Sequence, residues 1–176
     1  MTAEYHRLPA DLPEPEDDGA ADHLPGKRLD GTALQDYARG TLVAFVYPRT
    51  GTPGQPSPEG WDDIPGARGC TPQSCAFRDL HGELAALGAT VVGVSAMDPD
   101  EQAAFAEREA LPYPLMNDRE LRLASDLGLP TFEAAGMRLY KRLTLVAREG
   151  EIVKVFYPVF PPDRNAAEVA EWLAAA

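Results

Sequence analysis

Both cysteines of this 176-residue chain lie in one stretch, Gly69-Cys70-Thr71-Pro72-Gln73-Ser74-Cys75-Ala76-Phe77-Arg78-Asp79. The stretch follows a loop rich in proline and glycine, and it is followed by leucines at helical spacing, Leu80, Leu84 and Leu87. A proline is tolerated in the first turn of a helix because the N–H that it lacks would have no partner there. The pattern therefore predicts a helix that begins close to Cys70.

The predicted position of Cys70 at a helix start favours a reactive thiol. The reactive form of cysteine is the thiolate, and backbone N–H groups at a helix start stabilise the negative sulfur. In a helix, the five-residue spacing to Cys75 corresponds to a rise of roughly 7.5 Å between α carbons, whereas a disulfide requires roughly 4.4 to 6.8 Å. The pair therefore predicts a switch, helical when reduced and locally unwound when oxidised. Two buried and inert cysteines remain the alternative.

The composition sets the broad class of the protein. A mass of 19.0 kDa fits one domain with a sizeable core. The net charge of −12 argues against binding to nucleic acid or to anionic membranes. The first residues are polar and no apolar run has the length of a membrane span, so we expect a cytoplasmic protein. In that compartment a disulfide is more often catalytic or redox-sensing than structural.

Several common site motifs are missing from the sequence. The histidines His6, His23 and His81 are isolated, and two cysteines without a second pair do not have the spacing of a zinc site. The sequence has neither a dinucleotide-binding glycine motif nor a P-loop, and it has no G-x-S-x-G motif. We therefore expect no metal ion and no organic cofactor.

Alternating strand and helix patterns predict an α/β domain over residues 26–176, preceded by an extended or partly disordered segment, residues 1–25. Thr41 to Tyr47 is almost wholly apolar, which is typical of a buried central strand. The further strands are expected at Thr90–Ser95, Pro114–Met116, Arg138–Ala147 and Glu151–Tyr157, the last two joined by a turn at Arg148–Gly150. The further helices are expected at Leu29–Tyr37 as a short amphipathic segment, Asp98–Ala110 with Asp98 or Asp100 as its cap, Asp118–Leu127 and Asn165–Ala175.

A long loop, residues 48–69, separates the first strand from the cysteine stretch. Loops of this length without secondary structure are uncommon and are often functional. Its one large apolar residue, Trp61, has two interpretations: it attaches the loop to the domain, or it lines a pocket or a partner surface.

Two neighbouring segments resemble the active-site region of peroxiredoxins. Tyr47-Pro48-Arg49-Thr50-Gly51-Thr52-Pro53-Gly54 and the cysteine stretch are similar to the peroxiredoxin Q or bacterioferritin comigratory protein branch, where a second cysteine follows five residues after the first. Weaker matches follow in the same order at residues 92–95, 115–118 and 142–146. The resemblance covers about residues 25 to 160.

The resemblance implies a thioredoxin-like fold, with a central mixed sheet flanked by helices, and the reduction of hydrogen peroxide or organic hydroperoxides. Cys70 matches the peroxidatic cysteine and Cys75 the resolving cysteine of an intramolecular disulfide, which a thioredoxin-like donor reduces. Arg142 matches an arginine that supports the thiolate from a neighbouring strand. Pro48 and Thr52 match the proline and threonine of the P-x3-T-x2-C motif. We expect a monomer or a weak homodimer.

One departure from the family is large. The family places its threonine three residues before the cysteine, whereas here a 15-residue insertion, Gln55 to Gly69, separates Gly54 from Cys70. Thr50 and Thr71 are therefore alternatives to Thr52. Arg142, which stands beside Lys141 and Arg138, has the alternative of an ordinary exposed strand arginine or a salt bridge. For the whole protein, the alternatives are a redox sensor that uses the same cysteine switch and a scaffold with inert thiols.

Overall fold

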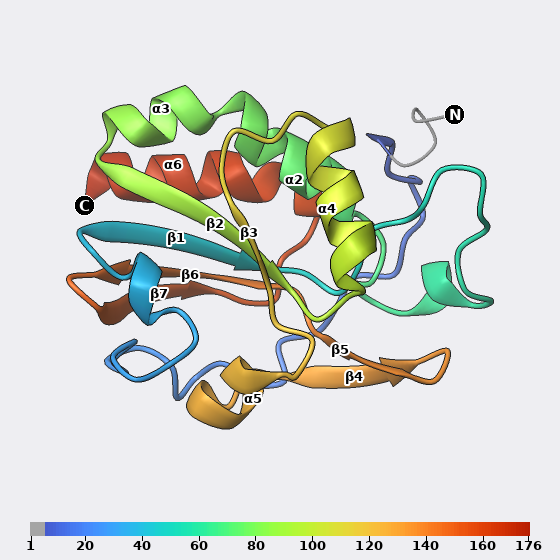
Figure 1. Cartoon of the computed structure of the whole chain (residues 1–176), viewed down its shortest axis with the longest axis horizontal. Coiled ribbons are helices and arrows are strands. Elements are labelled where there is room, and N and C mark those ends of the chain that lie inside the picture. Colours follow the sequence, from blue (N-terminus) through green and yellow to red (C-terminus); the bar gives the residue numbers. More distant parts are fainter. Residues whose placement is uncertain (1–5) are drawn as a thin grey trace.

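The computed structural model describes residues 6–176, which fold around one five-stranded sheet (Figure 1). The strand order is β3 (Leu115–Asn117), β2 (Ala89–Ser95), β1 (Thr41–Val46), β6 (Leu143–Arg148) and β7 (Glu151–Phe156). The pairs β1·β2 and β2·β3 are parallel, whereas β1·β6 and β6·β7 are antiparallel. The prediction of an α/β domain with a mixed sheet is confirmed.

Strand β1 is buried on both faces, which explains its unbroken apolar sequence. Its alternate residues Leu42, Ala44 and Val46 belong to one hydrophobic cluster. Val43 and Phe45 belong to a second cluster on the opposite face. Because successive side chains of a strand point to opposite faces, a strand covered on both sides needs apolar residues throughout.

Helices α2 (Cys70–Asp79), α3 (His81–Ala86) and α6 (Asn165–Ala175) cover one face of the sheet (Figure 1). They bury Phe77, Leu84 and Val169 in the second cluster. Helix α5 (Arg122–Leu127) lies on the other face together with buried leucines of the segment before β1. Helix α4 (Pro99–Arg108) lies beside β3. This packing holds the first residue of α2 close to the end of β1.

Local sequence signals predicted several boundaries of helices and strands correctly. Helix α6 has the predicted bounds. Asp98 caps α4, since its Oδ1 accepts from the backbone N–H groups of Asp100 and Glu101 at 2.9 and 3.1 Å. Glu149 and Gly150, both with positive φ, form the tight turn between β6 and β7.

The strand predicted over Arg138–Ala147 is wrong as a single element. Its first part is β5 (Met137–Tyr140), which pairs with β4 (Thr131–Ala134) in a separate two-stranded sheet. Its second part is β6 of the main sheet. Lys141 and Arg142 form the link between the two sheets. Period-two patterning shows which residues suit a strand, but the partner of each half is chosen by tertiary packing.

The helix predicted over Asp118–Leu127 begins four residues later than expected. The carboxylate of Asp118 accepts from the N–H groups of Arg122 and Leu123 at 2.9 and 3.0 Å, so Asp118 lies before α5 and satisfies the first N–H groups of the helix. The segment Leu29–Tyr37 contains only one short 3-10 turn, η1 (Gln35–Tyr37). A second 3-10 turn, η2 (Trp61–Asp63), lies inside the long loop.

Residues 6–25 run along the domain surface and contain no strand. Ala21 and Leu24 are buried in the first cluster, and Asp18 accepts hydrogen bonds from Lys141 Nζ at 3.0 Å and from the Tyr157 hydroxyl at 2.9 Å. The division of the chain between residues 25 and 26 stays a prediction, and residues 1–5 of the segment lie outside the described part. Within residues 6–176, no helix combines the length and the apolar character needed to cross a membrane.

Candidate active site

Cys70 is the first residue of α2, as the sequence predicts. Gly69 precedes it with a φ of 116°, and a Cβ on Gly69 would lie 2.7 Å from Cγ of Pro162. Only glycine therefore fits between the end of the long loop and the helix. The Cys70 side chain is buried, and its sulfur lies at the positive end of the helix dipole.

Arg142 reaches the sulfur of Cys70 from the link between β5 and β6. Its Nη2 donates to Cys70 Sγ at 3.3 Å. The residue is only 4% exposed, so the interpretation as an ordinary surface arginine is wrong. The expectation that it stands on a strand is also wrong, because it lies directly before β6.

Buried side chains hold the guanidinium of Arg142 in place. Its Nη1 donates to Gln73 Oε1 at 2.6 Å. Gln73 Nε2 in turn donates to Asn165 Oδ1 at 3.0 Å, and that oxygen also accepts from Thr144 Oγ1 at 2.6 Å. Gln73, Asn165 and Thr144 are fully buried, so the chain connects α2, α6 and β6 through one rigid network.

The last residues of the insertion also bind Arg142. Its Nη2 donates to the carbonyl oxygens of Gly66, Ala67 and Arg68 at 3.2, 3.0 and 3.3 Å. Among the described residues, no carboxylate forms an ion pair with Arg142. Carbonyl oxygens and the Gln73 amide therefore hold the buried guanidinium against the Cys70 sulfur.

A small cavity of about 30 Å³ opens beside Cys70, between the two ends of the long loop. Its lining includes Cys70, Thr52, Trp61 and two cationic residues, Arg49 and Arg68. The insertion thus leaves the domain after Gly54 and returns to the same pocket, as the loop beside α2 in Figure 1 illustrates. The volume suits a molecule on the scale of one or two waters.

The three candidate threonines differ in their surroundings, although all of them line this cavity. Thr50 is buried and its hydroxyl donates to Sδ of Met97 at 3.7 Å. Thr71 follows Cys70 in α2 and is also buried. Thr52 is half-buried at the cavity wall. Pro48 lies outside the lining, and its carbonyl accepts from Ser95 Oγ at 2.9 Å.

Trp61 meets both of its sequence interpretations. It is buried against Ala67 and Leu139, and it therefore attaches the long loop to the two-stranded sheet. It also lines the cavity beside Cys70. The indole is thus well placed to report events at that sulfur by fluorescence.

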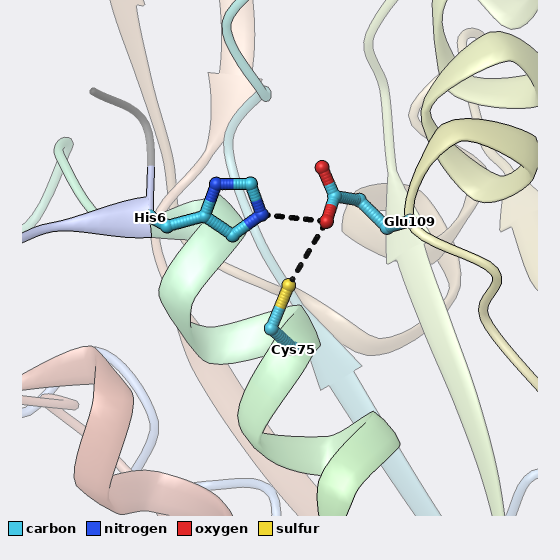
Figure 2. Close-up of side chains that lie close together, drawn as sticks. All are labelled: His6, Cys75 and Glu109. Carbon is cyan, nitrogen blue, oxygen red and sulfur yellow. Dashed lines mark hydrogen bonds and ion pairs between the residues drawn. The ribbon is translucent and has the colours of Figure 1, made fainter. Parts of the chain in front are cut away.

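Cys75 lies in the same helix but in different surroundings, which the sequence did not predict. Its thiol is buried and donates to Glu109 Oε1 at 3.4 Å. Burial first, and then the negative charge of Glu109, raise the pKa of the Cys75 thiol to about 12. His6 approaches the same carboxylate oxygen, with its Nε2 2.6 Å from Oε1 (Figure 2).

Sequence reasoning missed Gln73 and Glu109. Gln73 carried a signal, because a residue three positions after Cys70 lies on the same side of a helix. Glu109 carried none, since it stands among other charged residues at the end of α4 and only the packing brings it to Cys75.

Comparisons with known proteins agree with this geometry. The Redoxin family model matches residues 16–172. The chain is 28% identical over 152 residues to the chloroplastic peroxiredoxin Q of Gentiana triflora, covering 85% of this chain and 63% of the relative. It is 29% identical over 147 residues to peroxiredoxin Bcp of Bacillus subtilis, covering 81% of this chain and 84% of the relative. The chain thus spans less than two thirds of the length of this plant relative.

A solved structure gives the same result for the fold. The crystal structure of peroxidoxin BcpB from Mycobacterium tuberculosis is similar with a TM-score of 0.62 and 31% identity, over 78% of this chain and 80% of that protein. The thioredoxin-like α/β fold that the resemblance implies is therefore confirmed.

Proposed function

The chain belongs to the Redoxin family and, within it, to the peroxiredoxin Q and Bcp branch, and from this premise we propose that it is a thiol-dependent peroxidase. The observation that carries the proposal is the contact of 3.3 Å between the Cys70 sulfur, at the start of α2, and the guanidinium of Arg142. The substrates are hydrogen peroxide and organic hydroperoxides.

In the first step, the Cys70 thiolate attacks the terminal oxygen of the peroxide. A sulfur–oxygen bond forms and the oxygen–oxygen bond breaks, so Cys70 becomes a sulfenic acid and the peroxide is reduced to water or an alcohol once the leaving oxygen takes up a proton. Arg142 holds the thiolate and steadies the charge that develops on the oxygens. The buried network through Gln73 keeps that cation in place during the reaction.

In the second step, the thiol of Cys75 condenses with the sulfenic acid of Cys70, giving a disulfide and one water. Both cysteines lie in α2, where five residues of helix separate their α carbons by roughly 7.5 Å, too far for a disulfide. The first turns of α2 must therefore unwind before the bond forms. Unwinding also takes Cys75 away from the carboxylate of Glu109, which favours its ionisation.

In the third step, an external thioredoxin-like dithiol reduces the disulfide by exchange. The formation of the disulfide protects Cys70 from further oxidation to the sulfinic acid. The redox-sensor alternative is not favoured, because the relatives that the chain resembles are named peroxiredoxins.

We assign Thr52 and Pro48 to the substrate side of the site. Thr52 lines the same cavity as Cys70, so its side chain lies at the wall where a peroxide would bind. Pro48 acts indirectly, since it lies two residues after the end of β1 and directly before residues 49–52, which line the cavity. A cytoplasmic location, a monomer or weak homodimer and catalysis without an organic cofactor are parts of the same proposal.

Stopped-flow oxidation of the reduced protein by hydrogen peroxide, with Trp61 as the fluorescence reporter, tests the proposal. The wild type is expected to react in a fast phase and to lose two hydrogens, as read by intact mass. Cys70→Ser should lose the fast phase, with a rate lower by a factor of about 10³ or more. Cys75→Ser should keep it and stop at the sulfenic or a more oxidised acid. A Cys70→Ser variant that reacts as fast as the wild type would refute the proposal.

A further inference from the structure

Three side chains from distant parts of the sequence meet beside α2. They are His6 of the N-terminal segment, Cys75 in the middle of α2 and Glu109 directly after α4. Figure 2 shows the imidazole and the thiol pointing toward the same carboxylate oxygen. The three candidate ligand atoms all lie within 4.8 Å of one another. No role in the peroxidase reaction as proposed above requires His6 to be there.

The cluster has the chemistry of a zinc-type site. One imidazole nitrogen, one sulfur and one carboxylate oxygen are the ligand types that Zn²⁺ prefers. When Cys75 is ionised, the thiolate and the Glu109 carboxylate together carry two negative charges, which match a divalent cation. Glu109 and Cys75 are buried, and the imidazole side chain of His6 is 32% exposed, so the site is dry on one side and open to entry on the other.

The distances are close to those of a tetrahedral ion. Bonds of about 2.0 to 2.3 Å to Zn²⁺ place neighbouring ligand atoms roughly 3.3 to 3.8 Å apart. The pair Cys75 Sγ and Glu109 Oε1 already lies at 3.4 Å. The pair His6 Nε2 and Glu109 Oε1 lies at 2.6 Å and must open slightly. His6 lies near the N-terminus and its side chain is 32% exposed, so a small rotation of the imidazole toward solvent is inexpensive.

We propose that the reduced protein binds a divalent zinc-type ion through His6 Nε2, Cys75 Sγ and Glu109 Oε1. The ion replaces the thiol proton of Cys75, because a coordinating thiol loses its proton, and that proton goes to solvent. A water molecule completes the coordination. No bond between the ion and Cys70 is involved.

Two arginines set a limit on the affinity. Arg78 Nη1 lies 3.6 Å from Glu109 Oε1, and Arg108 Nε lies 3.7 Å from Oε2. Arg108 approaches the oxygen that the ion does not use. Arg78 must turn away from Oε1, although its Nη1 also donates to the backbone carbonyl of Glu109 at 2.8 Å and its Nε is bound to Asp79 at 3.0 Å. The site is therefore expected to exchange its ion with chelators.

Binding has a consequence for the peroxidase, and this consequence rests on the proposed function. A metal-bound Cys75 thiolate is held in place and is not available to condense with the Cys70 sulfenic acid. The ion therefore slows disulfide formation and leaves the first oxidation of Cys70 unchanged. With excess peroxide, Cys70 then proceeds to the sulfinic acid.

Cobalt binding to the reduced, chelator-treated Cys70→Ser variant tests the site directly, because Cys75 is its only thiol. We expect a saturable thiolate-to-cobalt charge-transfer band with one ion per chain, abolished by one equivalent of Zn²⁺. In the same background, His6→Ala and Glu109→Gln should each weaken binding about tenfold or more. The control His81→Ala removes a histidine of α3 outside the cluster and should bind as the parent does.

The outcomes separate the two proposals. A missing or unsaturable band, or a band that neither His6→Ala nor Glu109→Gln weakens, overturns the metal site. If Glu109→Gln unfolds, as circular dichroism would show, His6→Ala decides alone, since it alters only a segment at the domain surface. The Cys70→Ser variant cannot act as a peroxidase, so its cobalt binding is independent of the proposed function, and peroxide kinetics of the metal-free wild type are independent of the site.

Discussion

The two cysteines lie in one helix, five residues apart, yet their surroundings have opposite charge. The sulfur of Cys70 contacts the guanidinium of Arg142 at 3.3 Å and lies at the helix start. The sulfur of Cys75 contacts the carboxylate of Glu109 at 3.4 Å. Burial is similar, with 3% of Cys70 and 7% of Cys75 exposed, so the two sulfurs differ mainly in the charge of the side chain that contacts each of them.

The two cysteines of the reduced protein therefore differ in their electrostatic surroundings before any peroxide arrives. A nearby cation favours a negative sulfur in general, whereas burial and the Glu109 carboxylate raise the pKa of the Cys75 thiol. In the proposed peroxidase reaction, Cys70 is the nucleophile and Cys75 reacts second. A protein in which both thiols were equally ionised would have no fixed order of oxidation.

Removing the cation beside Cys70 has the largest expected effect on this asymmetry. Arg142→Gln should lower the rate of the first oxidation about 100-fold, because it removes a charged donor aimed at the reacting atoms. Stopped-flow fluorescence with hydrogen peroxide measures that rate. Arg138→Gln, which changes an exposed arginine of β5, is the matched control and should react as the wild type does. Equal rates for the two variants would remove Arg142 from the mechanism.

The raised pKa of Cys75 predicts a pH dependence of stability. The folded thiol ionises at about 12, whereas the unfolded thiol ionises near its ordinary value of about 9. Between these values the unfolded chain has lost the thiol proton and the folded chain has kept it. Stability is therefore fully present below pH 9 and falls as the pH rises, by about 1.4 kcal/mol per pH unit.

Urea unfolding of the metal-free, reduced protein from pH 8 upward measures this slope. Cys75→Ser has no thiol at that position, so the difference between the wild type and the variant isolates the contribution of Cys75 from that of the tyrosines. Parallel curves for the two proteins would show that the Cys75 thiol is not held in its neutral form.

Removing the anion beside Cys75 should lower the pKa of this thiol, whereas removing a cation would raise it. The expected effect is smaller than that of Arg142→Gln. Glu109→Gln in the Cys70→Ser background should lower the pKa of Cys75 by about 1 unit, because burial, the larger cause, remains. The ultraviolet absorbance of the thiolate, followed against pH, measures the shift. Glu107→Gln changes an exposed carboxylate of α4 and should leave the titration unchanged.

The smallest expected effect concerns the open side of the Cys70 cavity. Thr52→Val should slow the first oxidation several-fold, as expected from the loss of one hydrogen bond worth about 1 kcal/mol. Thr50→Val is the comparison, since Thr50 lines the same cavity and its hydroxyl donates to Met97. A larger loss for Thr50→Val than for Thr52→Val would reassign the threonine of the site.

Much of the fold could be predicted because its signals are local. The apolar run at Thr41–Val46, the Asp98 cap and the amphipathic pattern of Asn165–Ala175 each depend on residues near one another in sequence. The largest failure was long-range. The strand predicted over Arg138–Ala147 is divided because its first half pairs with β4, and nothing within those residues specifies that partner.

The candidate site divides in the same way. The sequence by itself determined that Cys70 begins a helix, that Cys75 follows within the same helix, and that the chain resembles peroxiredoxins, because spacing along a helix is a local property. The resemblance pointed to Arg142, but only the tertiary structure decided the full set of groups around each sulfur. Arg142 lies 72 residues from Cys70 along the chain, and Glu109 lies 34 residues from Cys75. The physical reason is that a side chain's electrostatic environment depends on distances in space, and packing of the sheet and helices sets those distances.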